Sequence, residues 1–137
     1  MIAVLLLVAT SLYAGFQWTI RVVVYPQLAA VPAASFASYE ARHQRLVSYA
    51  VGPLFVADGV AALVAFAVEP GPPTAATGGC LAAVLALTVL GAVPQHRRLS
   101  DGFDPAAHRR LLRVDSARLV AALGGVAAAV WFAAGRL

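Results

Sequence analysis

Charged residues are scarce in this chain. They make up 12% of its 137 residues, whereas hydrophobic residues make up 61%. Because soluble domains of this size carry about a quarter charged residues, we do not expect an ordinary water-soluble globular fold. The few charges also cluster and leave long stretches with none. This distribution predicts an integral membrane protein.

Cysteine and lysine are scarcer still. Cys80 is the only cysteine, which excludes an internal disulfide and a dithiol redox mechanism within one chain. No lysine is present, so the net charge of +4 comes from ten arginines set against six acidic residues. Arginines that lie between apolar segments indicate membrane topology, and we therefore expect no nucleic-acid partner.

Motifs for phosphate binding and nucleophilic catalysis are missing as well. The chain has no Gly-rich phosphate loop, no Walker motif, no GxSxG turn and no Cys–His nucleophile arrangement. No plausible base stands beside a Ser, Thr or Cys residue, so nucleophilic catalysis by these side chains is not expected.

The sequence does contain four long apolar segments, at about 2–25, 46–68, 75–93 and 105–134. A helix rises 1.5 Å per residue, so each segment is long enough to cross a hydrocarbon core of about 30 Å. The backbone must be helical there because no water satisfies its polar groups. We therefore predict an all-α fold, a bundle of four transmembrane helices that forms a single integral membrane domain over residues 1–137.

The arginines predict how this bundle is oriented. Those between the first and second segments, and between the third and fourth or at the start of the fourth, are Arg42, Arg45, Arg97, Arg98, Arg109, Arg110 and Arg113. Both connections are on one side of the membrane, and the positive-inside rule places that side in the cytoplasm. We expect a multi-pass protein of a bacterial inner membrane with both termini outside. No basic residue precedes the first helix, so a cleaved signal peptide is not expected.

Two local patterns describe the cytoplasmic connections. Between the first two membrane helices, apolar and polar residues alternate at helical spacing from Ser35 to Gln44, which predicts a short amphipathic helix. In the other connection, Asp104 is followed by Pro105. A carboxylate caps free N–H groups and a proline needs none, so this pair predicts the start of the fourth helix.

Polar residues form a stripe along the first predicted helix. Tyr13, Gln17, Arg21 and Tyr25 are each four residues apart, and Trp18 borders them. A charged side chain inside a membrane helix costs on the order of 3 kcal/mol, so such residues normally face the interior of a bundle and a partner there.

Other membrane segments carry charges that face the same interior. Asp58 lies deep in the second segment, and Asp115, Arg118 and His108 share one side of the fourth. We expect these residues to meet the polar stripe of the first helix in one cavity that opens to the cytoplasm. Asp58 is too deep to reach the headgroups, so it is either neutral or paired with Arg21 or Arg118. The alternative for both arginines is extension to the headgroups from near the helix ends.

All three histidines fall on the predicted cytoplasmic side. His43, His96 and His108, together with Asp115 or Glu40, have the chemistry to bind an Fe, Cu, Zn or Mn ion. No helix supplies two closely spaced ligands, however, and arginines beside two of the histidines disfavour a cation. The cofactor therefore stays open between none and a histidine-bound ion, and the alternative role of these histidines is hydrogen bonding at the membrane surface.

Several short motifs together resemble a known family. They are Gly15-Phe16-Gln17-Trp18, Tyr25-Pro26, Tyr39 with His43, Pro53 with Asp58, Pro94-x-His96-x-x-Leu99-x-x-Gly102-Phe103-Asp104, and Arg118. In this combination the chain resembles an uncharacterised family of bacterial four-helix integral membrane proteins, related to the anthrone-oxygenase-like proteins of aromatic polyketide pathways. The similarity extends over nearly the whole chain.

The resemblance implies a four-helix bundle with a polar cavity for a lipophilic small molecule, and an acid near the position of Asp58. It also implies an Asn-Trp-x-Arg-Thr run in the fourth helix. Here that run reads Asp115-Ser116-Ala117-Arg118-Leu119, so the arginine matches while the other three residues differ. The resemblance therefore specifies the expected architecture more closely than it specifies the reaction.

We therefore expect a membrane enzyme in natural-product metabolism that acts on a polyketide, terpenoid or quinone-like ring in a cavity between the first, second and fourth helices. The reaction is a cyclisation or isomerisation by acid–base chemistry, or an oxygenation. Proton transfer is assigned to Asp58, Asp115 or His43, and stabilisation of an oxyanion to Arg21 and Arg118. The residues expected to shape the pocket and bind the substrate are Tyr13, Gln17, Trp18, Tyr25 and Tyr49.

Two other function classes remain open. Intramembrane acids and arginines also mark the substrate paths of binding and transport proteins, and polar residues hold helices together in accessory membrane subunits. The partners expected in every case are the lipid bilayer and a lipophilic small molecule. The Gly124-Gly125 pair permits close helix contact within one bundle or between subunits, which leaves a homo-oligomer open.

Overall fold

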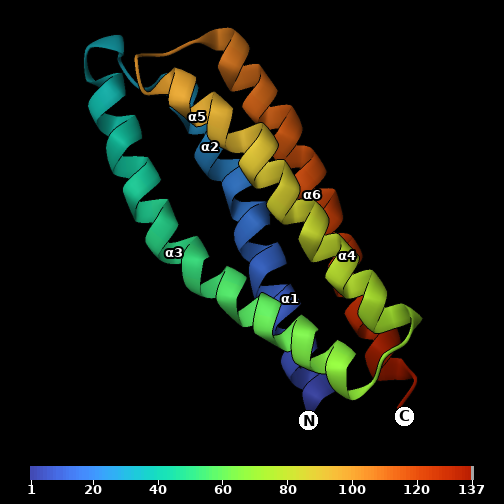
Figure 1. Cartoon of the computed structure of the whole chain (residues 1–137). Helices are drawn as coiled ribbons and strands as arrows, with labels where there is room; N and C mark the ends of the chain where they lie inside the picture. Colours follow the sequence, from blue (N-terminus) through green and yellow to red (C-terminus); the bar gives the residue numbers. More distant parts are fainter. Residues whose placement is uncertain (137) are drawn as a thin grey trace.

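Four long helical rods pack side by side in the computed structural model, which describes residues 1–136 (Figure 1). The rods span Ile2–Ala30, Ala33–Val68, Pro72–Leu99 and Pro105–Ala134, and each is long and apolar enough to cross a membrane. The protein is thus an all-helical bundle with the architecture of a multi-pass membrane protein.

Two of the rods are interrupted by short segments of other helix types. The first consists of α1 (Ile2–Thr19), η1 (Ile20–Val24), α2 (Tyr25–Gln27) and η2 (Leu28–Ala30). The third consists of α4 (Pro72–Ala86), η3 (Leu87–Ala92) and α5 (Val93–Leu99). The second and fourth are the continuous helices α3 (Ala33–Val68) and α6 (Pro105–Ala134). Of the interruptions, η1 and η3 are π-helical turns and η2 is a 3-10 turn.

A proline explains each π-helical turn. Pro26 has no N–H for the carbonyl four residues earlier, and its ring crowds that carbonyl. The N–H of Tyr25 bonds instead to Ile20, five residues back, and the N–H of Val93 just before Pro94 bonds to Thr88 in the same way. Each widened turn rotates the following residues relative to a regular helix, and single π turns of this kind are frequent at functional sites.

The second rod differs from the prediction. The amphipathic segment Ser35–Gln44 is not a separate short helix but the beginning of α3, which continues without a break to Val68. Its last residue, Gln44, and the two residues after it, Arg45 and Leu46, are good helix formers, and none of the three ends a helix. At 36 residues α3 is about 54 Å long, longer than a bilayer core is thick. Pro32 precedes the helix and Glu69 follows it.

The remaining boundaries follow local signals. The fourth rod covers the residues expected for it, and the carboxylate of Asp104 accepts a hydrogen bond of 2.8 Å from the N–H of Ala106 at its start. The third rod runs from 72 to 99 rather than from 75 to 93, and the first continues past Pro26 to Ala30.

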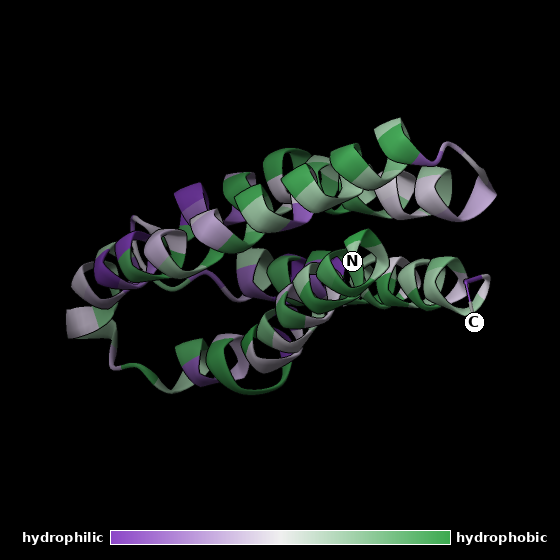
Figure 2. Cartoon of the chain, turned by 90° about the horizontal axis from the view of Figure 1, so that it is seen from below, coloured by the Kyte–Doolittle hydropathy of each residue, from purple (hydrophilic) through white to green (hydrophobic). Residues whose placement is uncertain are grey.

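Much of the surface of this bundle is apolar. Buried residues form three clusters along its length, centred on Leu28 and Leu111, on Leu6 and Phe132, and on Tyr13 and Val84. Many large hydrophobic side chains nevertheless point outward, and Figure 2 shows hydrophobic colour along the long helices. Side chains of this kind suit contact with lipid tails.

The polar connections gather at one end of the bundle. The turn between η2 and α3 and the loop between α5 and α6 lie together at the end opposite both termini (Figure 1). The predicted Arg-rich connections therefore share one end. At the other end, Arg136 forms an ion pair with Glu69 in the α3–α4 turn. The assignment of the Arg-rich end to the cytoplasm stays a prediction.

Candidate functional site

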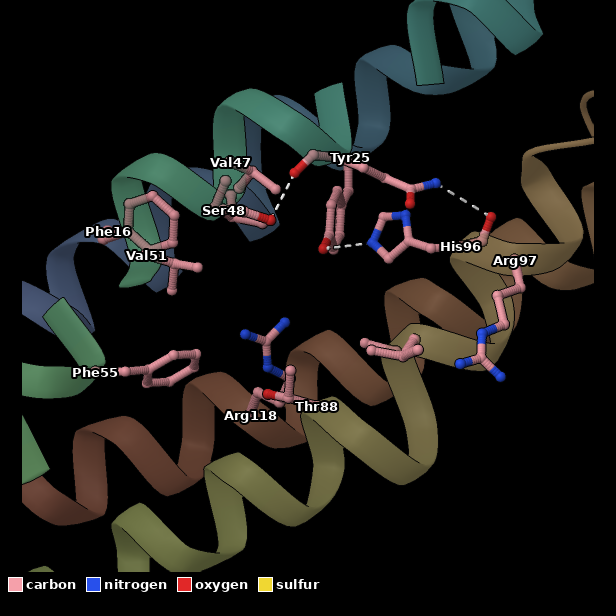
Figure 3. Close-up of a pocket in the computed structure, with 14 residues that line it drawn as sticks. Phe16, Tyr25, Val47, Ser48, Val51, Phe55, Thr88, His96, Arg97 and Arg118 are labelled. Atoms are coloured by element: carbon pink, nitrogen blue, oxygen red, sulfur yellow. Dashed lines mark hydrogen bonds between the residues drawn. The ribbon is translucent and has the colours of Figure 1, made fainter. Parts of the chain in front are cut away.

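A cavity of about 230 Å³ lies inside the bundle, in the half toward the Arg-rich end (Figure 3). All four rods contribute to its wall. The lining residues are Phe16, Ile20, Tyr25, Gln44, Val47, Ser48, Val51, Phe55, Thr88, Ala92, Val93, His96, Arg97 and Arg118. Half of these side chains are apolar and the other half carry polar groups, a mixture that suits the binding of a small molecule.

A chain of hydrogen bonds leads from a buried carboxylate to this cavity. The Oε1 atom of Glu40 lies 2.5 Å from Nδ1 of His96, and Nε2 of His96 lies 2.9 Å from the hydroxyl of Tyr25. The three residues come from α3, α5 and α2. Glu40 is fully buried and Tyr25 is 3% exposed, whereas the side chain of His96 is 13% exposed, so both ends of the chain are shielded from bulk water and its middle is partly accessible.

The carboxylate sets the tautomer of the histidine. An ionised Glu40 only accepts hydrogen bonds, so the Nδ1 atom beside it carries a proton. The Nε2 atom of the neutral ring is then an acceptor, and the hydroxyl of Tyr25 donates to it. A proton that leaves the hydroxyl of Tyr25 can therefore move to Nε2 of His96, and the positive ring that results lies beside the buried carboxylate of Glu40.

Further contacts hold the chain in place. Gln44 donates to Oε1 of Glu40 at 3.1 Å and to Oγ of Ser100 at 3.0 Å, which ties the start of α3 to the end of α5. Nε2 of His108, on α6, lies 2.8 Å from the backbone carbonyl of Tyr25. The ring of His43 stacks on that of His96, with centroids 5.9 Å apart. Tyr25 and His96 each lie near the proline that ends a π turn, so both turns position this chain.

A second polar network joins α1 to α6. Tyr13 donates to the amide oxygen of Gln17 at 3.1 Å, and the Gln17 amide donates to Oδ1 of Asp115 at 2.6 Å. The same oxygen accepts a hydrogen bond of 3.1 Å from Nη1 of Arg118, whose Nη2 lies 3.4 Å from the hydroxyl of Tyr13. All four residues are buried, so the network satisfies the pairing that charged groups inside a membrane require.

Arg118 connects this network to the cavity. Its guanidinium extends from α6 into the cavity, toward the part of the wall where Tyr25 lies (Figure 3). The Nε atom is buried and has no hydrogen-bond partner among the described residues. A buried guanidinium with a free donor is suited to bind a ligand oxygen that carries negative charge.

The predicted stripe on the first helix is only partly directed inward. Tyr13, Gln17 and Tyr25 are buried in the two networks. Arg21 is half-buried and donates to Oγ of Ser116 at 2.7 Å, so it braces α6 from η1 and does not line the cavity. Trp18 is 55% exposed and points out of the bundle, because its position falls between the inward-facing rows of α1.

Two other expected residues lie apart from the cavity. Asp58 is buried, but among residues 1–136 it forms no ion pair with Arg21 or Arg118, and its Oδ1 atom has no hydrogen-bond partner there, so of the two states expected for it the paired one is absent. Arg118 instead forms its ion pair with Asp115, one helical turn away on α6. Tyr49 is 72% exposed on the outer face of α3, so it does not shape the cavity as predicted.

The three histidines do not form a common metal site. His43 and His96 are neighbours, but His108 bonds to the backbone of Tyr25 and packs beside the ring of Phe103. Both ring nitrogens of His96 are in hydrogen bonds with Glu40 and Tyr25. Among the described residues, no group of three or more His, Cys, Asp and Glu side chains is arranged to hold an ion. The hydrogen-bonding alternative fits this geometry.

Sequence reasoning did not find the role of Glu40. The sequence predicts a short amphipathic helix from Ser35 to Gln44, and on such a helix Glu40 is expected only as a possible metal ligand. One signal was available: Glu40 is the only acidic residue between Met1 and Val56, and it is followed by His43 three residues later. The aromatic wall of Phe16 and Phe55 was also missed, since both lie among many other apolar residues.

Comparison with protein-family models, with curated proteins and with solved structures finds no match for this chain. The resemblance to anthrone-oxygenase-like proteins therefore stays a prediction. Any statement about function depends on the chemistry of the cavity itself.

Proposed function

We propose that this protein is a small membrane-embedded enzyme that moves a proton on a lipophilic cyclic substrate. The observation that carries the proposal is the hydrogen-bonded chain Glu40–His96–Tyr25, which ends in a cavity that also contains the guanidinium of Arg118. A proton carrier and a cationic group on one small cavity are the parts that enolisation of a ketone, or ionisation of a phenol, requires.

The proposed step starts with the carbonyl oxygen of the substrate at Arg118. The oxygen of Tyr25 takes a proton from the carbon next to that carbonyl, while the hydroxyl proton of Tyr25 moves to Nε2 of His96. The C–H electron pair becomes the double bond of an enolate, whose negative oxygen is stabilised by the guanidinium. The imidazolium that forms lies against the carboxylate of Glu40. Return of the proton to a different carbon completes an isomerisation without a co-reactant. In a ring closure, the enolate carbon first adds to a second carbonyl carbon of the substrate, the π bond of that carbonyl breaks, and the proton goes to the alkoxide oxygen that results.

The apolar part of the wall supports this chemistry. Phe16 and Phe55 offer aromatic faces for a ring, and Val51 lies between them in the lining. Charges that develop among such residues interact more strongly than in water, because the surroundings have a low dielectric constant. The enolate is also the species from which direct reaction with dioxygen would begin, so proton removal is common to both reaction types expected from the sequence.

The test uses a probe ketone in place of the unknown substrate. α-Tetralone, a two-ring ketone with one enolisable position beside its carbonyl, is added to the protein in lipid vesicles in heavy water. Uptake of deuterium at that position is followed by mass spectrometry. We expect uptake to be faster than in empty vesicles, and Tyr25→Phe to lose about 10²–10⁴-fold of the added rate, the usual contribution of a general acid–base group.

Tyr49→Phe is the matched control, because it removes the same hydroxyl from an exposed position on α3. It is expected to keep the rate of the unchanged protein. Equal rates for the Tyr25 and Tyr49 variants contradict the proposal. Binding of the ketone without any deuterium uptake would favour the alternative, a binding or transport protein without chemistry.

A further inference from the structure

A second hollow lies on the outside of the bundle, back to back with the cavity. It is a groove of about 440 Å³ between the first rod and the first half of α3. Its lining residues are Phe16, Ile20, Val24, Tyr39, Arg42, His43, Leu46, Val47 and Ala50. Polar side chains line one part, toward the Arg-rich end, and the rest is apolar.

The cavity and the groove share three lining residues, Phe16, Ile20 and Val47. The partition between them is therefore one layer of side chains from η1, α1 and α3. None of these side chains has a polar atom, so no hydrogen bond or ion pair holds the partition closed. Phe16 and Val47 are only partly buried, which is consistent with contact from both sides.

The size of the cavity limits what fits inside it. An apolar cavity of about 150 Å³ in another protein holds one benzene ring. A cavity of about 230 Å³ therefore has room for a head of one or two rings and no room for a long chain as well. The cavity is partly open, since its lining residues Ser48 and Arg97 are exposed. A molecule that resides in the bilayer and carries such a chain needs a path by which the chain leaves the cavity toward lipid.

We propose that the substrate is a membrane lipid with a one- or two-ring head and a hydrocarbon tail, and that the tail leaves the cavity between Ile20 and Val47 into the outer groove. This inference rests on the proposed function of the cavity. The head then lies between Tyr25 and Arg118, while the tail follows the apolar part of the groove into the surrounding lipid.

The free energy of moving the tail from lipid into the groove determines which quantity the experiment has to measure. A tail that moves from lipid into the groove exchanges one apolar environment for another, so it gains little free energy. If the tail has an outlet, the cavity therefore binds the tailed and the tailless molecule about equally well, and the tail does not tighten binding. A closed cavity, in contrast, would reject the tailed molecule through steric overlap.

The experiment uses two photoactivatable phenols, a trifluoromethyl-diazirinyl phenol and the same phenol with a decyl chain. Both are added at equal mole fraction in vesicles of phosphatidylcholine and phosphatidylglycerol that contain the full protein. Adducts on the cavity residues Val51 and Phe55 are counted by mass spectrometry. We expect the two phenols to label the unchanged protein within about twofold of each other, a difference of less than 1 kcal/mol.

Ala50→Trp fills the groove at a residue that does not line the cavity, and it is expected to reduce labelling by the tailed phenol at least about tenfold, while the tailless phenol stays within about twofold. Val56→Trp, the same substitution at an exposed position of α3 away from both hollows, is expected to change neither. If Ala50→Trp does not fold, Leu46→Trp blocks the groove from another residue outside the cavity lining and is expected to act in the same way.

The outcomes separate the two proposals. If neither phenol labels the cavity of the unchanged protein, the proposed function fails. If only the tailless phenol does, or if the plugging variants affect both phenols equally or affect neither, the cavity stands and the tailed substrate is overturned.

Discussion

Asp115 and Arg118 carry their charges inside the bundle. Both are fully or almost fully buried, and they pair through Oδ1 of Asp115 within the network that includes Gln17. The sequence pointed to both, because a charged residue in an apolar helix must have a partner. It did not show which residue would be that partner: Arg118 pairs with Asp115 on its own helix and not with Asp58.

Removing one member of this pair should cost stability. In Asp115→Ala, the guanidinium of Arg118 stays buried without its carboxylate, and we expect the free energy of unfolding to fall by about 3–5 kcal/mol. Denaturant unfolding in detergent micelles, followed by helical circular dichroism, measures this change. Asp101→Ala removes an exposed loop carboxylate and should change stability by less than about 0.5 kcal/mol. Equal effects of the two substitutions would show that the pair is not structural.

At the scale of elements, the prolines determine how the site is assembled. Pro26 and Pro94 each follow a π turn, and the two turns bring Tyr25 and His96 to the same cavity from different rods. The start of α6 at Asp104 and Pro105 was readable from the sequence because capping is local. The continuation of α3 through the Ser35–Gln44 segment was not, since an amphipathic pattern looks the same in a separate helix and in an extension.

Close packing of η3 against α6 gives a prediction for one glycine. A Cβ atom at Gly91 would lie 2.7 Å from a methyl group of Val114, which is too close for either residue to stay in place. Gly91→Ala should therefore destabilise the protein by about 1–3 kcal/mol through overpacking. Thermal unfolding in detergent measures the loss.

Two further variants make that test specific. Gly79 lies in α4 with open space around it, so Gly79→Ala should leave stability unchanged or raise it by up to about 1 kcal/mol. Val114→Ala should restore most of the stability lost in Gly91→Ala, since it removes the methyl group that the new side chain meets. Failure of this rescue would place the cause elsewhere.

At the scale of the whole molecule, the four apolar rods and their shared Arg-rich end were predictable from composition and spacing alone. Both depend on properties summed over many residues, so a few misplaced boundaries do not change them. The cavity was predictable only in outline. The chemistry proposed for it depends on Glu40, which the fold buries completely although its local sequence resembles that of an exposed helix.

The arginine distribution predicts the orientation of the protein in the membrane, and single cysteines test this prediction. In a Cys80→Ser background, single cysteines are placed by Ser100→Cys at the Arg-rich end and by Pro70→Cys in the α3–α4 turn. We expect a membrane-impermeant maleimide to label the second variant in intact cells and the first only after the membrane is opened. The reverse pattern would place the Arg-rich end outside.

The most direct measurement for the central claim is a double-variant cycle on deuterium uptake by α-tetralone. The unchanged protein is compared with Tyr25→Phe, Glu40→Gln and the double variant. If Glu40 acts through His96 and Tyr25 as one proton-transfer chain, its effect disappears once the tyrosine hydroxyl is gone. We predict that the double variant is no slower than Tyr25→Phe alone. Losses that multiply would contradict a single chain and would assign the two residues separate roles.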